Sequence, residues 1–295
     1  MAGKLMKAVQ YNGYGQGPDG LQHVEVPIPT PKNDEVLLKL EAASLNPFDW
    51  KVQKGMLRPF LPRKFPHIPA SDVAGEVVEV GPGVTNFKAG DKVVAVVNPM
   101  NGGGLAEFAV TKENITVARP SKLSADKVVG LPIAGHYAVQ LAKLGNTHVT
   151  ATCGARNIEL VKNLGADEVL DYKTPDGAAL RSPSGIKYDA VIHCATGIPW
   201  STFEPNLSPN GKVVDITPSP SALVTFALKK LTLSKKQLVP LIVIPKSENL
   251  QYLVNLVKEG KLKTIIDSKY PLGKAKDAWA KSIDGHATGK IIVEP

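Results

Sequence analysis

Two patterns of hydrophobic and polar positions divide the chain. Up to about residue 125, short β-branched or alternating runs are separated by glycine and proline turns, as at residues 35–40, 75–80 and 91–97. Regularly spaced strands of this kind predict an antiparallel, barrel-like domain. We place this first domain at residues 1–126.

From residue 127, helical patterns alternate with short, nearly continuous apolar strands. Helices are expected at residues 137–144 and 157–164, and strands at residues 148–152, 168–172, 188–194 and 211–217. Apolar strands between helices predict a doubly wound parallel sheet, which binds ligands at the carboxyl ends of its strands. We assign residues 127–261 to this Rossmann-type α/β domain. Residues 262–295 read as two strands around a short helix and are expected to return to the first domain.

Composition and charge exclude several classes of protein. Hydrophobic residues make up 43% of the chain and charged residues 21%, as in ordinary globular proteins. The longest apolar run, residues 238–245, contains two prolines and reads as a buried strand. Two cysteines, Cys153 and Cys194, exclude a disulfide framework and fit a reducing compartment. The beginning of the chain lacks signal-peptide anatomy.

The formal net charge of +8 suits an anionic partner or a solvated lysine-rich surface. We expect no nucleic-acid partner, because no nucleic-acid motif accompanies the charge. Residues 221–236 are apolar with two lysine pairs. The favoured interpretation is a helix that covers the sheet, with its lysines in solvent. Three alternatives are a rim for a hydrophobic substrate, a homodimer contact, and a face that binds anionic membrane.

Several segments resemble one enzyme family. Residues 69–93, which run from Pro-Ala-Ser-Asp to Gly-Asp-Lys-Val, resemble the signature of the GroES-like catalytic domain in medium-chain dehydrogenases/reductases. Asn-Pro-Phe-Asp at residues 46–49 is similar to a segment of zeta-crystallin-like quinone reductases and alkenal/enone reductases. Further likenesses lie at residues 102–108, 164–172 and 289–293. The chain is identified as a member of the zinc-free quinone-oxidoreductase branch of this family. It is most similar to plant members that are located at the chloroplast envelope.

One departure from the family lies at Gly135–His136. Family members place a helix, the first sheet strand and a glycine-rich phosphate turn before the helix that begins here. A strand-plus-helix segment of that kind has roughly 30 residues. Either the molecule lacks this segment, or residues are missing from the sequence at this junction. We favour missing residues, because deletion of the first strand would expose the edges of its neighbours.

The sequence predicts NADPH as the cofactor and no metal. The two cysteines lie in the cofactor half and the six histidines are scattered, so the ligand set of a zinc site is missing. After the second strand, Arg156 is placed for a 2′-phosphate and no acidic residue precedes Glu159. Arg156 could instead be a surface residue at a helix start. The resemblance also implies cofactor contacts from Lys51, Cys153, Gly154, Ala155, Tyr172, Ala195, Thr217, Gly289 and Lys290.

The expected chemistry belongs to the cofactor, because no catalytic triad or reactive-cysteine motif is present. Both cysteines are expected to be small packed residues at strand ends. We expect reduction of the carbon–carbon double bond of α,β-unsaturated carbonyls, namely lipid-derived enones, enals or ketols, with Asn46 and Lys51 as catalytic candidates. Asp49 could join the site or cap a helix. The alternatives are an NADPH quinone reductase and a non-catalytic, membrane-associated nucleotide-binding protein. The resemblance implies the chloroplast, either the periphery of the inner envelope or the stroma.

Overall fold

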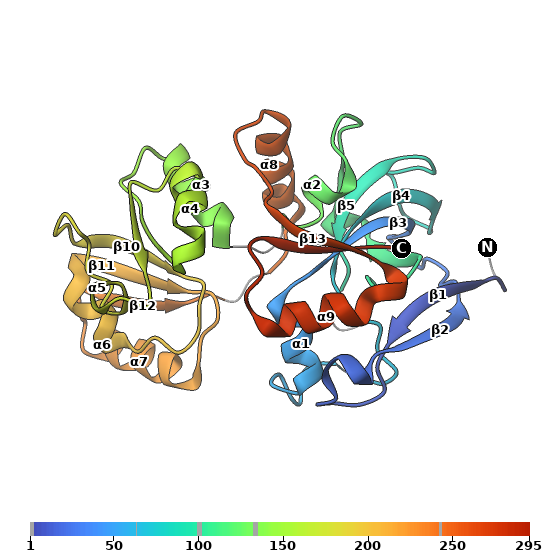
Figure 1. Ribbon diagram of the computed structural model, residues 1–295. Coiled ribbons are helices and arrows are strands. Elements are labelled where there is room, and N and C mark those ends of the chain that lie inside the picture. Colours follow the sequence, from blue (N-terminus) through green and yellow to red (C-terminus); the bar gives the residue numbers. More distant parts are fainter. Residues whose placement is uncertain (1–2, 63, 99–101, 132–134, 242–243) are drawn as a thin grey trace. The chain divides into compact units, whose positions relative to one another are not determined.

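The computed structural model describes residues 3–62, 64–98, 102–131, 135–241 and 244–295. The chain forms two compact units, Met1–Ala134 with Pro245–Pro295, and Gly135–Ile244 (Figure 1). The sequence places these boundaries at 126/127 and 261/262 instead. The difference arises because helices α2 (Ala125–Val128) and α8 (Ser247–Lys258) pack on the first unit. Their buried residues, Val128 and Val254 among them, cover its sheet.

A mainly antiparallel sheet forms the first unit, in the order β13-β14-β3-β4-β5-β7, with β6 also paired to β3. Among the named strands of this sheet that the structure describes, only β13 and β14 pair in parallel. The strands are β3 (Glu35–Leu45), β4 (Asp72–Val80), β5 (Lys92–Val96), β6 (Phe108–Lys112), β7 (Thr116–Ala118), β13 (Ile266–Pro271) and β14 (Lys290–Glu294). A separate hairpin joins β1 (Leu5–Gln10) and β2 (Gln22–Pro27). The fold expected for the first domain is confirmed, and β13 and β14, from the last segment of the chain, belong to its sheet.

Helices α1 (Pro47–Lys54) and α9 (Ala275–Asp284) pack together in the first unit. Trp279 is fully buried, and its indole Nε1 donates to Gln53 Oε1 over 2.9 Å. Gln53 Nε2 in turn donates to the carbonyl oxygen of Gly17 over 2.8 Å. A buried indole N–H needs such a partner, so Gln53 fixes α1 against α9.

Two parallel sheets form the second unit (Figure 1). One pairs β8 (Thr150–Cys153) with β9 (Glu168–Asp171), and the other has the order β10-β11-β12, with β10 (Tyr188–His193), β11 (Leu207–Asp215) and β12 (Gln237–Pro240). The helices are α3 (Gly135–Leu144), α4 (Ile158–Asn163), α5 (Pro175–Ala178), α6 (Trp200–Phe203) and α7 (Pro220–Leu231). The parallel α/β architecture is confirmed.

The junction at Gly135 explains why the second unit has two sheets. Gly135 and His136 are successive residues of α3. Within the described residues, α3 follows no strand of this unit. β8 and β10 therefore each hydrogen-bond to a neighbour on one side only. The exposed strand edges that loss of the first strand predicts are present.

Candidate functional site

Three strands of the first unit bring together Asn46, Asp72 and Lys290. Asn46 follows β3, Asp72 begins β4 and Lys290 begins β14. β3 lies between the other two, because Ser44 pairs with Asp72 and also with Ile292. Lys290 Nζ donates to Asn46 Oδ1 over 2.7 Å, and Asn46 Nδ2 donates to Asp72 Oδ2 over 2.8 Å. A hydrogen-bonded path thus joins an ammonium to a carboxylate through one amide.

Burial controls the charges of this network. It lowers the pKa of the Lys290 ammonium to about 8, against the attraction of Asp72 and Asp49. Burial also raises the pKa of Asp72 to about 6 and that of Asp49 to about 7. A buried charge without a partner is unfavourable by several kcal/mol, so the lysine and the carboxylates stabilise one another here. Asn46 holds them in register.

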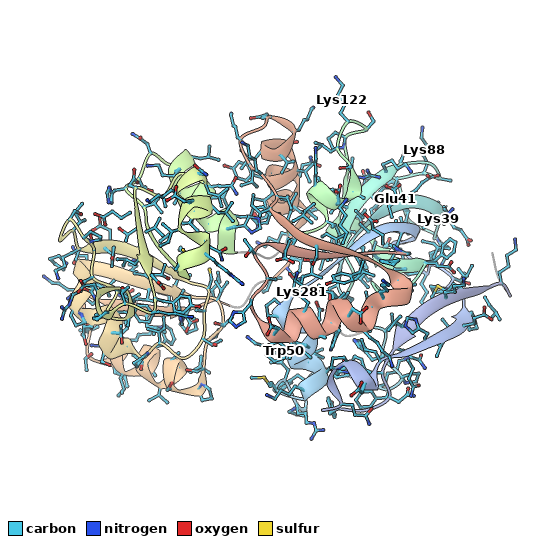
Figure 2. All side chains as sticks on the ribbon, in the orientation of Figure 1. Lys39, Glu41, Trp50, Lys88, Lys122 and Lys281 are labelled. Atoms are coloured by element: carbon cyan, nitrogen blue, oxygen red, sulfur yellow. The ribbon has the colours of Figure 1, made fainter. Side chains whose placement is uncertain are left out.

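Asp49 caps helix α1. The backbone N–H of Asn46 donates to Asp49 Oδ2 over 2.7 Å, which is half of a capping box. Of the two interpretations left open by the sequence, the structural cap is confirmed. Trp50 belongs to the same helix (Figure 2). Lys51 follows it, with its Nζ 5.7 Å from the centroid of the Trp50 ring. Among the described contacts, Lys51 is not part of the Asn46 network.

Gly289 and Gly130 place the Lys290 side chain. Gly289 has φ +123°, and a Cβ there would lie 2.4 Å from the Ile265 carbonyl oxygen. The N–H of Lys290 donates to that oxygen over 2.8 Å. A Cβ at Gly130 would lie 2.7 Å from Lys290 Cγ, so the aliphatic stem packs directly on backbone. Both glycines are needed for close approach, which accounts for the Gly-Lys pair singled out in the sequence.

The second unit gathers five predicted cofactor residues at the carboxyl ends of β8 and β9, namely Cys153, Gly154, Ala155, Arg156 and Tyr172. Cys153 ends β8, and its carbonyl oxygen accepts from the N–H of Tyr172 over 3.1 Å. The Tyr172 hydroxyl lies 3.4 Å from where a Cβ of Gly154 would stand. Arg156 is exposed on the short 3-10 helix Ala155–Asn157 that follows.

Ala195 and Thr217 lie together at the ends of β10 and β11, on the other sheet. Thr217 Oγ1 donates to the Ala195 carbonyl oxygen over 2.6 Å, and its N–H donates to Asp215 Oδ1 over 3.0 Å. His193 Nδ1 lies 3.2 Å from the same Asp215 oxygen, and both side chains are buried. The predicted residues of this unit therefore form two groups, one on each sheet.

The cysteines differ from one another in burial. Cys153 is partly buried, whereas Cys194, which was expected to be packed, is exposed. Its neighbour Ile192 on β10 is 50% exposed as well. In a doubly wound sheet, helices cover both faces of such a strand. Among the described residues β10 pairs with β11 alone, which leaves one side of the strand open near Ile192 and Cys194.

The residues present fit part of a nicotinamide dinucleotide. Arg156, Gly154 and Tyr172 offer a cation, an open backbone and an aromatic ring to an adenosine 2′-phosphate. The pyrophosphate of such a ligand lies on a glycine-rich turn between the first strand and its helix. The described residues provide no such turn before α3. The adenosine end therefore fits, and the pyrophosphate end does not.

Sequence reasoning missed Asp72 and the His193–Asp215 pair. Asp72 lies inside the residues 69–93 that carry the resemblance, where a carboxylate that directly precedes the apolar start of a strand is an available signal. Asp215 ends a valine-rich strand in the same way. Burying a charge requires a partner, so each could have prompted a search for one. No group of three or more metal-ligating side chains occurs among the residues that the structure describes.

Comparison with known proteins agrees with both units. The alcohol dehydrogenase GroES-like domain family matches residues 32–121, and the zinc-binding dehydrogenase family matches residues 164–293. An Arabidopsis thaliana protein named chloroplast envelope quinone oxidoreductase homolog is 68% identical over 329 positions, covering all of both chains. An NADPH-dependent alkenal/one oxidoreductase of Arabidopsis chloroplasts is 30% identical, covering 99% of this chain and 80% of its own.

A solved structure agrees as well. The quinone oxidoreductase from Coxiella burnetii has a TM-score of 0.89 at 28% identity, and the match covers 99% of this chain and all of that one. Two family profiles, a 68% identical relative of full coverage and this structure all agree on one assignment. The chain belongs to the quinone-oxidoreductase homologues of the medium-chain dehydrogenase/reductase family of oxidoreductases.

Proposed function

We propose that this protein is an NADPH-dependent reductase of the carbon–carbon double bond in α,β-unsaturated carbonyl compounds of lipid origin. The observation that carries the coenzyme preference is the position of Arg156 directly after β8. The first acidic side chain beyond it, Glu159, forms an ion pair with Lys162 over 3.2 Å. This segment thus offers a guanidinium to a 2′-phosphate, and the next acidic side chain along the chain is paired with a lysine.

When bound, the reduced nicotinamide supplies a hydride to the β-carbon while a proton adds to the α-carbon, which leaves a saturated carbonyl compound and NADP⁺. The protein's part is to position the reactants and to stabilise negative charge on the carbonyl oxygen. Lys51 is the proposed donor to that oxygen. Asn46 is buried and engaged on both sides, so we assign it a positioning role through Lys290 and Asp72.

The enone preference draws on the name of the 30% identical alkenal/one reductase. Quinone reduction is the second candidate, because the 68% identical relative and the Coxiella structure both carry quinone oxidoreductase names. A substrate panel separates the two. We expect faster NADPH oxidation with an alkenone than with a benzoquinone, and slower oxidation of NADH with either.

The panel is run on two proteins, the chain itself and an extended variant. The Arabidopsis alignment spans 329 positions and this chain has 295 residues, so 34 positions have no counterpart here. The extended variant carries a strand-and-glycine-turn segment of about that length, taken from the Arabidopsis relative, between Gly135 and His136. If it oxidises NADPH with quinones alone, the enone assignment is wrong. If it binds NADPH and turns over neither class, the non-catalytic alternative replaces the proposal.

We also propose a chloroplast location at the inner-envelope periphery or in the stroma, from the names of the plant relatives. Among the described residues, no helix is long and apolar enough to cross a bilayer. Helix α7 exposes Leu223, Val224, Leu228 and Leu231 beside Lys229 and Lys230. This leucine face suits peripheral contact with an anionic membrane. A homodimer remains a proposal that sedimentation analysis tests.

A further inference from the structure

A small polar cavity lies beside helix α1 in the first unit. It leaves about 10 Å³ for the centre of a water molecule, which is close to the least that one buried water needs. Its walls come from Tyr11, which follows β1, from α1, and from residues between 67 and 71, which lead into β4. The cavity shares one residue, Asp49, with the network around Asn46.

Tyr11 lines this cavity and has a hydroxyl that needs a partner. The side chain is fully buried, and among the described residues its hydroxyl has no hydrogen-bond partner. The backbone N–H groups of Tyr11 and His67 each donate to the other's carbonyl oxygen over 3.0 Å. The Tyr11 ring also meets the Phe65 ring edge-on, with 5.9 Å between centroids. The ring is therefore held in place, and a buried hydroxyl without a partner is unfavourable.

The backbone of the cavity wall is already engaged in hydrogen bonds. The carbonyl oxygens of residues 67 to 71 accept, in order, from the N–H groups of Tyr11, Gly103, Leu105, Gly104 and Val97. Within this wall Ala70 has a left-handed φ of +68°, which a residue with a side chain keeps only where its surroundings enforce it. A wall fixed in this way does not bring a carbonyl oxygen to the Tyr11 hydroxyl. The partner of that hydroxyl is therefore sought inside the cavity.

Asp49 supplies an acceptor on the cavity lining. Its Oδ2 accepts from the Asn46 N–H, and a carboxylate can accept several hydrogen bonds. Burial and then the charge of Asp49 raise the pKa of the Tyr11 hydroxyl, so the phenol stays protonated and can donate. Burial lowers the pKa of His67 to about 4, so its imidazole is neutral at pH 7. Among the described residues that line the cavity, none is a lysine or an arginine.

We propose that this cavity binds one water molecule, which accepts a hydrogen bond from the Tyr11 hydroxyl and donates one to the Asp49 carboxylate. Tyr11 is then a positioning residue, because it acts through the water on the cap of α1, the helix that carries Lys51. Hydrogen bonds to a carboxylate favour its ionised form, so the water helps Asp49 to stay charged despite burial. The inference goes beyond the proposed function and does not depend on it, because it involves no coenzyme.

The test uses Tyr11→Phe, which removes the hydroxyl and keeps the ring. A high-resolution crystal structure of the unchanged protein should show one water within about 3 Å of both Tyr11 Oη and an Asp49 oxygen, and that water should be absent from the variant. Carbon-13 NMR of the Asp49 carboxyl group should show its pKa rise by about one unit in the variant, which is a tenfold change in acid dissociation. Asp72 and Lys290, which also act on the charge of Asp49, stay unchanged in both proteins. Asp49→Asn identifies the signal.

Tyr14→Phe is the matched control. Tyr14 packs edge-on against Phe65, as Tyr11 does, but it does not line the cavity. Its replacement should leave the titration of Asp49 unchanged. A cavity without water in the unchanged protein would overturn the inference, and this result stands even if Tyr11→Phe does not fold. An Asp49 pKa that is the same in Tyr11→Phe and the unchanged protein, or that rises equally in both tyrosine variants, would overturn it as well.

Discussion

Lys290 Nζ donates to Asn46 Oδ1 over 2.7 Å and so joins positions 244 residues apart. The contact closes the first unit, because it fastens the chain's last strand to the start of α1. It also sets a positive charge beside Asp72 and Asp49 in a buried place. Stability and charge placement therefore depend on the same side chain.

Replacement of that lysine tests the network. Lys290→Met removes the ammonium and leaves two carboxyl groups buried without a cation, so the free energy of unfolding should fall by about 3 kcal/mol. Denaturant unfolding measures this loss. Lys281→Met is the matched control, because Lys281 forms a more exposed ion pair with Asp267 worth at most about 1 kcal/mol. If both variants lose the same free energy of unfolding, the buried network contributes no more than an exposed ion pair.

His67 gives the protein a specific sensitivity to acid. Burial lowers its pKa from 6.5 to about 4, so the folded state resists its protonation while the unfolded state does not. The stability linked to His67 is present above about pH 6.5 and is lost as the pH falls towards 4. At pH 4 the linked loss is about 3 kcal/mol.

His67→Asn should remove this part of the pH dependence. Unfolding curves at pH 7 and pH 4.5 measure the difference for both proteins, and the variant should lose less stability between the two. His23→Asn is the control, since His23 is exposed on β2. If the two asparagine variants show the same pH dependence, the buried imidazole is not its source.

Arg156 is expected to set the coenzyme preference. Arg156→Gln removes the cation proposed for the 2′-phosphate, so the affinity of the extended variant for NADPH should fall roughly 10- to 100-fold while that for NADH changes little. Fluorescence titration of each coenzyme measures both. Arg181→Gln serves as the control, because Arg181 pairs with Asp176 in the same unit and is exposed. An unchanged NADPH-to-NADH ratio would remove Arg156 from the site.

The leucine face of α7 should bind anionic membranes. Leu231 is 80% exposed, and Leu231→Glu would place a negative charge on that face and weaken binding to phosphatidylglycerol vesicles. Co-sedimentation measures the bound fraction, with phosphatidylcholine vesicles for comparison. Ile186→Glu is the control at another exposed apolar side chain of the same unit. If both variants bind like the unchanged protein, α7 is not the contact.

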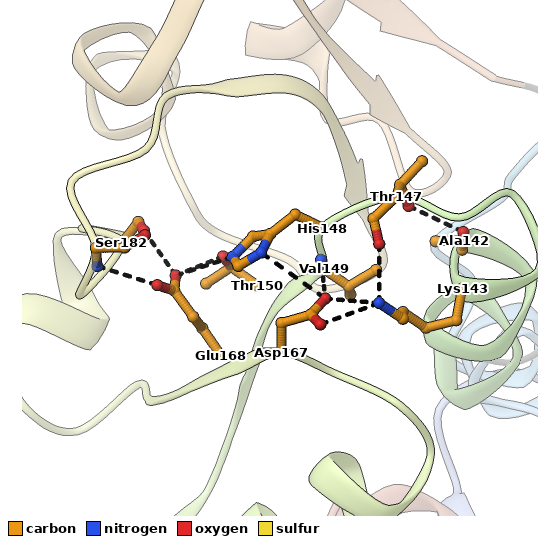
Figure 3. Close-up of polar contacts among 10 residues, drawn as sticks. Ala142, Lys143, Thr147, His148, Val149, Thr150, Asp167, Glu168 and Ser182 are labelled. Atoms are coloured by element: carbon orange, nitrogen blue, oxygen red, sulfur yellow. Dashed lines mark hydrogen bonds and ion pairs between the residues drawn. The ribbon is translucent and has the colours of Figure 1, made fainter.

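The sequence predicts most of the architecture, because the patterns are local. The short apolar runs of residues 35–40 and 75–80 and the helical period of residues 137–144 are each visible in one window. The departure at Gly135 is visible as well, since it interrupts a strand–turn–helix pattern. The sequence does not show how the two sheets of the second unit are held together. That depends on Glu168, which accepts hydrogen bonds from Thr150 (Figure 3) and from Ser184, in segments on either side of it in the chain.

The candidate site is less predictable than the fold, because several of its residues meet only through contacts between distant segments. Arg156 and Tyr172 follow from the ends of two strands that neighbour each other in the chain. Asp72 and Lys290 meet only through the pairing of β3 with β4 and β14, so neither residue's surroundings indicate the other. The exposure of Cys194 depends on which strands pair with β10, and among the described residues only β11 does so. Pairings between distant segments carry this information, and single windows of sequence do not.

Transfer of deuterium from NADPH labelled at nicotinamide C4 to an alkenone tests the central claim most directly. The extended variant should place the label on the β-carbon of a saturated ketone, as mass spectrometry and NMR of the product would show. Deuterium on the carbonyl carbon of an alcohol, or none in any product while a quinone consumes the coenzyme, would contradict it.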